Sequence, residues 1–522
     1  MSDAGAGIVL VGMPASGKST VGRLVAARLG RPFLDTDELV AGHAGMPMAD
    51  YIRRHGEAAA RALESKAVLE ACAVPGAVIA TGGGAALDPL NRWGLWHHGT
   101  VAWLDLAGDE LLKRLRADGV PRPTLEPYDE ERLTMVLADR APVYRAADIR
   151  LDASGSPERI GGDLISKLGP LRGRRLLDAE VERHHPIGPR TARFVMGVDL
   201  AGDGPRGVGI VDRRLLTAAP ELVRALDVTS CLPVAAGERS KRIRTLERVL
   251  EWLAAERVER ETPLIAAGGG TIGDLAGTAA ALYARGLPLV QVPTTWLAQA
   301  DSAIGGKVAV DLSGSKNAVG AFWPPVAVIS DVAALRSLPV RLRRDGMAES
   351  IKAAIIGDPS LWRLLEERGA NALRTDEAGR YAILERSASL KLGVCQRDPF
   401  ETGARRSLNL GHTVGHALEI ESRYRLPHGA AVALGMRAVA AIAAARDGDP
   451  ELAPRLDVLL DWLGFKLRRT FDPGAVRTAM LVDKKRRGGR QRWILPMEIG
   501  RVIEADDVTD AELEIGLKTI AA

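Results

Sequence analysis

Short apolar runs, each followed by a segment of helical periodicity, recur along the N-terminal and central parts of the chain. The runs cover residues 8–12, 78–80 and 100–104 in the N-terminal part and residues 207–211, 264–267, 289–292 and 326–330 in the central part. Residues 18–29, just after the first run, have the 3.6-residue period of a helix. Because continuous apolar runs are typical of strands buried on both faces, the pattern predicts two parallel sheets covered by helices.

Beyond about residue 335 the pattern changes to long alanine- and leucine-rich segments with a 3.6-residue period, which predicts a mainly helical region. These segments cover residues 347–357, 376–396, 411–421, 429–446 and 451–463. A stretch rich in arginine, glycine and proline before the second sheet is typical of a linker. The predicted segments are an α/β domain at 1–170, a linker at 171–190, a Rossmann-like α/β domain at 191–335 and a mainly helical domain at 336–522.

Length and composition limit the function classes. A chain of 522 residues is too long for a single core, and 46% hydrophobic with 26% charged residues is typical of a soluble globular protein. The 70 basic residues exceed the 66 acidic ones by too little to indicate a nucleic-acid or membrane partner. Three cysteines without paired spacing argue against disulfides and a thiolate zinc site. The N-terminus lacks a basic leader, and the most apolar stretch, residues 430–445, is too short to span a bilayer, so we expect a cytoplasmic enzyme with small-molecule partners.

The first of two glycine-rich signatures is Gly12-Met13-Pro14-Ala15-Ser16-Gly17-Lys18-Ser19, between a predicted strand and a predicted helix. In this pattern backbone N–H groups surround a β-phosphate, the lysine reaches the β- and γ-phosphates, and the last serine ligates Mg²⁺. The pattern therefore predicts a site for a nucleoside triphosphate with Mg²⁺. The residues expected to hold it are Gly12, Ala15, Ser16, Gly17, Lys18, Ser19 and Thr20.

The second signature, Gly268-x-Gly270-x-x-Gly273, follows an apolar run and opens a predicted helix, which is the spacing of a dinucleotide site. Threonines, a carboxylate and lysines cluster after the next predicted strands. Polar side chains at strand ends fit a nucleotide crevice in a sheet of this type.

The helical region carries another group of chemistry-bearing residues. Glu349 and Lys352 are three residues apart and share one helix face. His412 and His416 are four apart, and His428 precedes a glycine at a predicted helix start. One carboxylate with two imidazoles makes a three-ligand Zn²⁺ site with positions open for substrate.

Around the first signature, the order of short motifs resembles shikimate kinase. The motifs are Asp35-Thr36-Asp37, Gly-Glu-x-x-x-Arg-x-x-Glu from Gly56 to Glu64, Thr81-Gly82-Gly83-Gly84, Arg122-Pro123 and Arg140-Ala141-Pro142-Val143-Tyr144. The resemblance implies that Asp37 holds the attacking hydroxyl of shikimate and that Asp35 supports Mg²⁺ through water. It implies that Arg61 and Arg140 clamp the carboxylate, that Gly82 and Gly83 admit the ring, that Arg122 neutralises the transferring phosphoryl group, and that Arg114 stacks on the adenine of ATP.

The blocks from Gly237-Glu238-Arg239-Ser240-Lys241 to Asp483-Lys484-Lys485 resemble 3-dehydroquinate synthase. The resemblance implies that Glu349, His412 and His428 bind Zn²⁺ or Co²⁺. It implies NAD contacts from Asp212, Glu238, Lys241, Gly269, Gly270, Asp274, Thr294, Thr295, Lys307 and Lys316. It implies a substrate pocket of Arg285, Asp301, Lys307, Asn317, Lys352, Lys391, Arg405, Asn409, His416 and one of Lys484 or Lys485. Because this family is typically dimeric, Arg285 would be supplied to the partner subunit of a homodimer.

Together the two resemblances imply a bifunctional enzyme of the shikimate pathway. One half would use ATP to phosphorylate shikimate to shikimate 3-phosphate, with Lys18, Asp37 and Arg122 as catalytic residues. The other would convert 3-deoxy-arabino-heptulosonate 7-phosphate to 3-dehydroquinate and phosphate, with NAD taking up and returning a hydride. Its catalytic residues would be Asp301, Lys307, Lys352, Arg405, Asn409 and His416.

Two alternatives stay open. The second half could be a cyclase that makes an aminocyclitol or valiolone ring from another sugar phosphate, although Lys391 and Arg405 suit a carboxylate. The chain could also be a fusion in which one inactive domain acts as a scaffold.

Three departures from the family patterns bear on these alternatives. Ala60 stands where a phenylalanine is usual, and Ala430 stands where a glutamate is usual. In residues 398–401 the acidic residues at the two ends match the family pattern, but the charged residues usual between them are absent. The change at Ala430 removes a carboxylate from the outer shell of the metal site.

Overall fold

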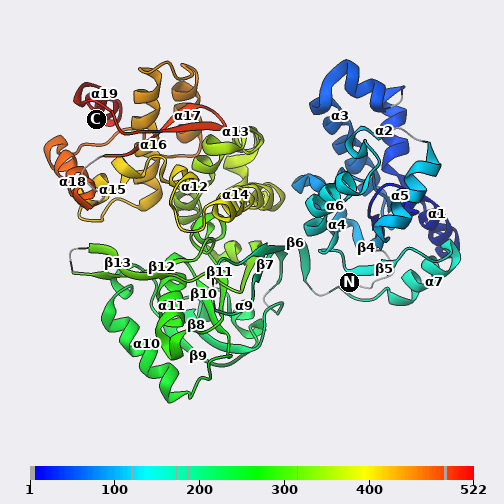
Figure 1. Ribbon diagram of the computed structural model, residues 1–522, viewed down its shortest axis with the longest axis horizontal. Helices are drawn as coiled ribbons and strands as arrows, with labels where there is room; N and C mark the ends of the chain where they lie inside the picture. Colours follow the sequence, from blue (N-terminus) through cyan, green and yellow to red (C-terminus); the bar gives the residue numbers. More distant parts are fainter. Residues whose placement is uncertain are drawn as a thin grey trace. The chain divides into compact units, whose positions relative to one another are not determined.

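The computed structural model describes residues 6–46, 48–119, 122–171, 173–185, 187–200, 202–313, 315–486 and 491–522. They belong to two compact units, Met1–Glu180 with Arg193–Leu200, and Val181–Ala192 with Ala201–Ala522. Each unit contains a parallel sheet, and the second continues into a mainly helical part (Figure 1). The predicted fold class is therefore confirmed. In the described residues, no helix combines the length and hydrophobicity needed to cross a membrane.

The first unit is built on a five-stranded sheet in the order β2-β3-β1-β4-β5. Its strands are β1 (Gly7–Val11), β2 (Phe33–Asp35), β3 (Val78–Ala80), β4 (Gly99–Asp105) and β5 (Ile149–Asp152). Its helices are α1 (Lys18–Leu29), α2 (Thr36–Ala44), α3 (Met48–Cys72), α4 (Pro89–His98), α5 (Gly108–Asp118), α6 (Glu130–Tyr144) and α7 (Pro157–Lys167). The buried strand β1 pairs in parallel with β3 and β4, so the loop after β1 lies at the centre of the sheet edge.

The strands β6 (Arg174–Glu182) and β7 (Thr191–Val198) are neighbours in a sheet. β6 lies inside residues 171–190, where we expected a linker. Leu176 and Leu177 are buried in it, and Asp178 forms a bidentate pair with Arg193 of β7 at 2.7 and 2.9 Å. The arginines that flank this short apolar pair explain why the apolar pattern did not predict a strand.

The sheet of the second unit contains five consecutive parallel strands in the order β14-β11-β10-β8-β9. They are β8 (Gly207–Asp212), β9 (Val228–Val234), β10 (Leu264–Gly268), β11 (Leu289–Pro293) and β14 (Ala327–Asp331). The helices of this region are α8 (Leu215–Ala218), α9 (Pro220–Ala225), α10 (Ile243–Ala255) and α11 (Gly270–Leu282). An antiparallel pair, β12 (Lys307–Leu312) and β13 (Ser315–Phe322), packs on α11 through Gly277, where a Cβ would lie 2.3 Å from Val308.

The mainly helical part surrounds α16, which is buried along most of its length and packs against α12, α15, α17 and α19. Its helices are α12 (Val340–Gly357), α13 (Pro359–Ala372), α14 (Glu377–Arg397), α15 (His412–Glu421), α16 (His428–Ala444), α17 (Leu452–Trp462), α18 (Pro473–Arg486) and α19 (Asp510–Ile520). A small antiparallel ribbon of β15 (Trp493–Glu498) and β16 (Arg501–Ala505) completes it. The five predicted helical segments coincide with α12, α14, α15, α16 and α17.

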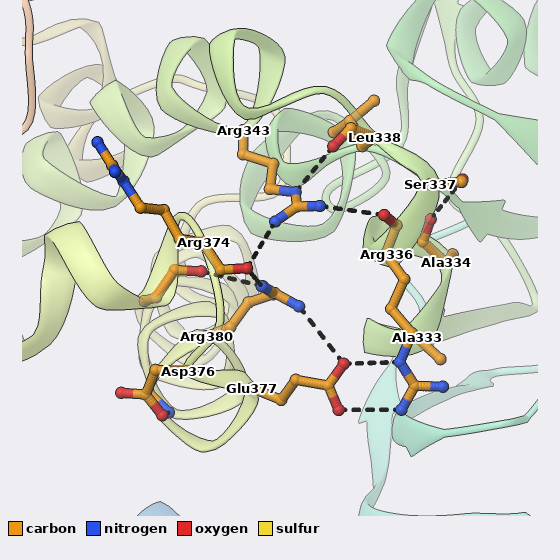
Figure 2. Close-up of polar contacts among 12 residues, drawn as sticks. Ala333, Ala334, Arg336, Ser337, Leu338, Arg343, Arg374, Asp376, Glu377 and Arg380 are labelled. Atoms are coloured by element: carbon orange, nitrogen blue, oxygen red, sulfur yellow. Dashed lines mark hydrogen bonds and ion pairs between the residues drawn. The ribbon is translucent and has the colours of Figure 1, made fainter.

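A network of arginines fixes the starts of α12 and α14, the helices that carry several predicted site residues (Figure 2). The guanidinium of Arg343 donates to backbone carbonyls, including that of Leu338 at 2.9 Å, and Arg380 donates to the carbonyl of Arg374 at 3.1 Å. Glu377 lies 3.7 Å from Arg380 and forms a bidentate pair with Arg336 at 2.6 and 2.9 Å. Figure 2 shows this carboxylate between the two guanidinium groups.

Replacing Glu377 by glutamine is expected to lower the melting temperature of the full chain by a few degrees. Arg380 is 2% exposed, and in the variant its charge would lose a counter-charge. We expect the free energy of unfolding to fall by about 1–2 kcal/mol, less than for a fully buried pair, because Glu377 is partly exposed. Calorimetry of the full chain measures the shift. The exposed Glu367 on α13 offers the matched control, and Glu367→Gln should move the transition by less than about one degree. Equal shifts for the two variants would contradict the role given to Glu377.

Candidate active sites

The nucleotide signature forms a tight loop between β1 and α1. Its φ angle is positive at Gly12 (145°), Ala15 (64°) and Gly17 (95°), and loops of this kind present backbone N–H groups to an anion. A Cβ at Gly12 would lie 2.7 Å from the carbonyl oxygen of Leu104, so the position requires glycine. The buried hydroxyl of Ser16 has no hydrogen-bond partner among the described residues. A phosphate oxygen would satisfy this hydroxyl.

Lys18 folds back over the loop. Its ammonium donates to the carbonyl oxygens of Gly12 at 3.0 Å and Met13 at 2.8 Å. Burial lowers the pKa of Lys18 to about 8, an effect that the carboxylates of Asp37 and Asp35 oppose. A phosphate chain would give this buried ammonium the negative partner that it needs, so the loop fits ATP.

The predicted magnesium residues lie together where β2 ends. The hydroxyl of Ser19 donates to Oδ2 of Asp35 at 2.6 Å, and Oδ1 of Asp35 accepts the N–H of Asp37 at 2.9 Å. Oxygen donors of this kind suit Mg²⁺. The Asp37 carboxylate faces Gly82, where a Cβ would lie 2.4 Å from Oδ1. Burial raises the pKa of Asp37, and the charge of Lys18 opposes that rise.

Two arginines approach the glycine segment that follows β3. A Cβ at Gly83 would lie 2.9 Å from Nη1 of Arg140, and a Cβ at Gly84 would lie 2.9 Å from Nη1 of Arg61. Arg140 is buried, and Arg61 pairs with Glu64 at 2.8 Å. Two guanidinium groups therefore border a backbone segment that carries no side chains, an arrangement suited to a small carboxylate.

In the described part of the chain, the side chains of three other predicted kinase residues make no hydrogen bond or ion pair to the loop. Arg122 pairs with Asp118, although its charge contributes to the low pKa of Lys18. Arg114 bonds Glu110 at 3.0 Å rather than the loop. Thr20 is exposed on the first turn of α1. The structure thus gathers the predicted phosphate, magnesium and carboxylate residues, and the adenine contact of Arg114 stays a prediction.

In the second unit, Glu349 of α12 meets His412 and His428, the first residues of α15 and α16. The ligand atoms of the three side chains all lie within 4.8 Å of one another. Oε1 of Glu349 is 3.1 Å from Nε2 of His428 and 3.5 Å from Nε2 of His412. Nδ1 of His412 lies 3.1 Å from the carbonyl oxygen of Leu410, which leaves Nε2 toward the cluster.

Carboxylates dominate the electrostatics of this cluster. Burial raises the pKa of Glu349, but Lys352 and His412 outweigh it and hold the pKa well below its ordinary range. Burial lowers the pKa of His428, but hydrogen bonds to Glu349 and Glu419 outweigh it and raise the pKa to about 10. The same carboxylates would stabilise a divalent cation. One carboxylate and two imidazoles are a donor set that fits Zn²⁺ or Co²⁺.

Two lysines converge on Asp301, which lies in the helical turn η6 (Ala298–Ser302). The ammonium of Lys352 pairs with Glu349 and lies 3.6 Å from Oδ1 of Asp301. Lys391 lies 2.8 Å from Oδ2 of Asp301 and donates to its backbone oxygen at 2.7 Å. Burial lowers the pKa of Lys352, but Asp301 and Glu349 outweigh it and raise the pKa, so Lys352 remains a cation in the site.

Glu401 joins two further predicted residues. Its carboxylate accepts hydrogen bonds from Lys307 at 2.5 Å and from Nδ2 of Asn409 at 3.1 Å. Arg405 is 2% exposed, and backbone carbonyls at 2.6 and 2.9 Å orient its guanidinium. The side chain of His416 is more exposed than that of His412, and the two ring centroids lie 5.1 Å apart. Sequence reasoning noted Glu401 but gave it no role.

A cavity of about 310 Å³ opens beside Asn409. Its lining residues are Glu401, Arg406, Asn409, Thr413, Arg492, Ile494 and Glu504. Glu504 of β16 lies 3.6 Å from Arg406 and 3.5 Å from Arg492, so two arginines share one carboxylate in the wall. Sequence reasoning assigned no role to Thr413, which lies between His412 and His416, and no local motif marks Arg406, Arg492 or Glu504.

The dinucleotide signature opens α11 after β10, as its spacing predicts. A Cβ at Gly269 would lie 3.0 Å from the side chain of Thr295, and a Cβ at Gly270 would lie 2.8 Å from Oγ of Ser302. The buried hydroxyl of Ser302 has no hydrogen-bond partner among the described residues. This narrow strip without side chains, beside hydroxyl groups, fits a dinucleotide.

Lys241 connects the other predicted NAD residues of this crevice. Its ammonium pairs with Asp274 and donates to Oδ1 of Asn317. Burial raises the pKa of Asp274, and the charge of Lys241 opposes that rise. Lys316 lies 3.9 Å from Glu238, so these two predicted contacts also adjoin. The buried Thr294 follows β11, beside the glycine strip, and its N–H donates to the last carbonyl of β10 at 2.9 Å.

Among the described residues, two predicted synthase residues, Asp212 and Arg285, do not join these groups. Asp212 ends β8 and accepts the N–H of Arg214 at 3.0 Å. Arg285 is exposed in the turn η5 (Tyr283–Arg285), with a φ of 63°. The side chains of Lys484 and Lys485 lie outside the part of the chain that the structure describes.

Family models match three segments of the chain. They are shikimate kinase at residues 14–168, the N-terminal part of 3-dehydroquinate synthase at residues 231–345 and its C-terminal part at residues 346–486. A 3-dehydroquinate synthase of Symbiobacterium thermophilum is 37% identical over 375 residues, which cover 70% of this chain and 97% of that protein. A 2-epi-valiolone synthase of Actinosynnema mirum is 38% identical over 328 residues, which cover 60% of this chain and 86% of that protein.

Solved structures resemble the second unit. The 2-epi-5-epi-valiolone synthase ValA of Streptomyces hygroscopicus subsp. jinggangensis, with NAD⁺ and Zn²⁺ bound, has a TM-score of 0.60 and 28% identity. The match covers 65% of this chain and 98% of that one. A 2-deoxy-scyllo-inosose synthase complexed with carbaglucose-6-phosphate, NAD⁺ and Co²⁺ has a TM-score of 0.58 and 25% identity, over 66% of this chain and 100% of that one.

Proposed function

The chain belongs to the 3-dehydroquinate synthase family and carries a shikimate kinase domain ahead of it, and from this premise we propose that it catalyses two steps of the shikimate pathway. It phosphorylates shikimate with ATP to shikimate 3-phosphate. It also converts 3-deoxy-arabino-heptulosonate 7-phosphate to 3-dehydroquinate with release of phosphate. The observation that carries the synthase assignment is the convergence of Glu349, His412 and His428 within 4.8 Å, beside the buried Lys352.

In the kinase unit, ATP bound with Mg²⁺ supplies the phosphoryl group. Lys18 would neutralise charge on the phosphate chain, and Ser19 and Asp35 would hold the magnesium ion. Asp37, whose pKa is raised by burial, is placed to hold the attacking hydroxyl and accept its proton. Arg61 and Arg140 orient shikimate through its carboxylate.

In the synthase unit, Glu349, His412 and His428 would hold the divalent ion, and Lys241 and Asp274 would border NAD. When bound, NAD accepts and returns a hydride while the cation polarises the oxygen of the oxidised carbon. The chain's own residues do the rest. Lys352 is a buried cation next to the metal ligands, which suits it to hold an oxygen that gains negative charge.

The substrate has two anionic groups, and the site has separate cations for them. Lys391 and Arg405 lie on the Asp301 side of the site and suit the carboxylate, with Arg405 already oriented by two carbonyl groups. Lys307 and Asn409, which share Glu401, suit the phosphate end. His416, next to the ring of His412, is placed to move a proton.

The relatives named as valiolone synthases raise the second candidate, a cyclase for a heptulose phosphate without a carboxylate. The full chain with NAD⁺ and Zn²⁺ is expected to release phosphate from 3-deoxy-arabino-heptulosonate 7-phosphate at least about 100-fold more efficiently than from the heptulose 7-phosphate that lacks the carboxylate. A substrate without the carboxylate would forgo the charge-assisted hydrogen bonds that Lys391 and Arg405 offer, and the loss of two such bonds would cost about 3 kcal/mol or more. A phosphate-release assay with both substrates measures the ratio, and ADP formation with shikimate tests the kinase. The reverse preference would establish the second candidate.

We also propose that the synthase part forms a homodimer in which Arg285 completes the pocket of the partner subunit. The exposed position of Arg285 at the end of η5 supports this arrangement, because an exposed side chain can reach a partner subunit. Light scattering on the full chain tests the assembly. We propose a cytoplasmic location as well, because the cytoplasm holds the ATP and NAD that the two reactions need.

A further inference from the structure

Glu419 is a buried carboxylate of α15 to which neither the sequence analysis nor the proposed reaction gives a role. It is 5% exposed. It stands seven residues after His412 and three after His416, so all three side chains share one face of the helix. Burial of a charged group on this face is costly unless the charge has partners, and Glu419 has three.

Each carboxylate oxygen of Glu419 has its own contacts. Oε2 lies 3.6 Å from Nδ1 of His428 and 4.0 Å from Nε2 of His416. Oε1 lies 3.4 Å from the ammonium of Lys316. Lys316 is itself held over the ring of Tyr424, 4.3 Å from its centroid. One oxygen is therefore fixed by Lys316 while the other faces the imidazole of His428.

The two nitrogens of His428 thus face different carboxylates. Nε2 lies 3.1 Å from Glu349, on the side of the proposed metal site, and Nδ1 faces Glu419 on the opposite side. A neutral imidazole carries one N–H, and a carboxylate beside Nδ1 keeps that proton on Nδ1. The lone pair of Nε2 is then available to a metal ion. His412 has the equivalent arrangement, with its Nδ1 against the carbonyl of Leu410.

We propose that Glu419 is the positioning residue of His428: it contacts Nδ1 on the side away from Glu349, and it thereby fixes the ring orientation and the tautomer. The inference rests on the proposed metal-dependent function of Glu349, His412 and His428. Outer-shell carboxylates of this kind raise metal affinity by roughly 10- to 100-fold.

The test is Co²⁺ binding by the metal-free full chain, measured by competition with a chromophoric chelator. Glu419→Gln preserves shape and removes the charge, and its Kd for Co²⁺ is expected to rise by about 10- to 100-fold. Its synthase rate should recover to within a few-fold of wild type at saturating Co²⁺. The matched control is Glu421→Gln on the same helix, which removes a carboxylate that pairs with Arg469 at 3.2 Å and should change the Kd by less than about twofold.

The outcomes separate this inference from the proposed function. If Glu419→Gln binds Co²⁺ as tightly as wild type, Glu419 is not the positioning residue. If Glu421→Gln weakens binding as much as Glu419→Gln does, the effect is one of helix stability and the inference is also overturned. If Glu349→Gln leaves Co²⁺ binding unchanged, the proposed metal site itself is wrong. Kinase activity of each variant, which depends on residues of the other unit, reports the amount of full-length protein in the assay, and circular dichroism reports the folding of the synthase unit.

Discussion

Replacing Lys18 by methionine is expected to lower the kinase kcat/KM by roughly 10³-fold and to leave the synthase reaction at its wild-type rate. The Lys18 ammonium is buried between two carbonyl oxygens and the carboxylates of Asp35 and Asp37. During phosphoryl transfer, negative charge shifts between the phosphate oxygens, and the Lys18 ammonium is placed to stabilise it. Loss of one such group costs about 3–4 kcal/mol of transition-state stabilisation. Coupled assays for ADP and for phosphate on the same preparation measure both activities.

The pKa of Lys18 gives this prediction a second readout. Burial lowers the pKa to about 8 in the protein without nucleotide, and bound phosphates would raise it again. Above pH 8, ATP binding must therefore take up a proton, so the Kd for ATP should rise with pH by up to tenfold per unit. In Lys18→Met this rise should disappear. The exposed Lys66 supplies the control, and Lys66→Met should keep both the activity and the pH profile. A fall in both activities of Lys18→Met would point to misfolding and count against the two-site account.

Elements buried on both faces were predictable from the sequence. The apolar runs before the two signatures match β1 and β10 to within about one residue, because such strands need apolar side chains at every position. The alanine-rich helices of the last region were predictable for the related reason that they are buried over most of their surface. α16 is the clearest case, with only Arg437 charged between Gly429 and Ala443.

Half-exposed ribbons were not predictable in this way. β13 is exposed at most positions and carries polar residues and glycine between its apolar side chains, so it leaves no periodic signal. β15 contains a proline, and its partner β16 (Arg-Val-Ile-Glu-Ala) is only five residues long and does not alternate regularly between charged and apolar residues. The cavity residues Arg492 and Glu504 were missed for the same reason, since they lie next to or on this ribbon.

Chemistry-bearing residues were found where short spacing placed them on one helix face, as with Glu349 and Lys352. Partners from distant segments were not predictable by spacing. Glu401 meets Lys307 from 94 positions away, and Lys391 meets Asp301 from 90 positions away. Glu419 lies between these two cases. Its place on the same helix face as His412 was predictable from the spacing, but its contact with His428 was not, because that contact depends on how α15 packs on α16.

Replacing Glu349 by glutamine is expected to lower synthase kcat/KM by roughly 10³-fold or more while kinase activity stays at the wild-type level. Glu349 contributes the only carboxylate of the three-residue cluster, and it also pairs with Lys352. Glutamine keeps the shape but loses the charge that balances a divalent cation. A metal ion that polarises the reacting oxygen is worth several kcal/mol, and each 1.36 kcal/mol is a factor of ten in rate.

Metal removal distinguishes this explanation from a packing defect. Chelator treatment of the wild-type chain should reduce phosphate release to the level of Glu349→Gln, because both lose the same cation. Added Zn²⁺ or Co²⁺ should then restore the wild type but not the variant. Glu366→Gln, which removes a partly exposed carboxylate paired with Arg455 at 2.8 Å, should keep wild-type rates throughout. If chelation left phosphate release unchanged while Glu349→Gln abolished it, the carboxylate would act through its protein contacts, such as Lys352, rather than through a metal ion.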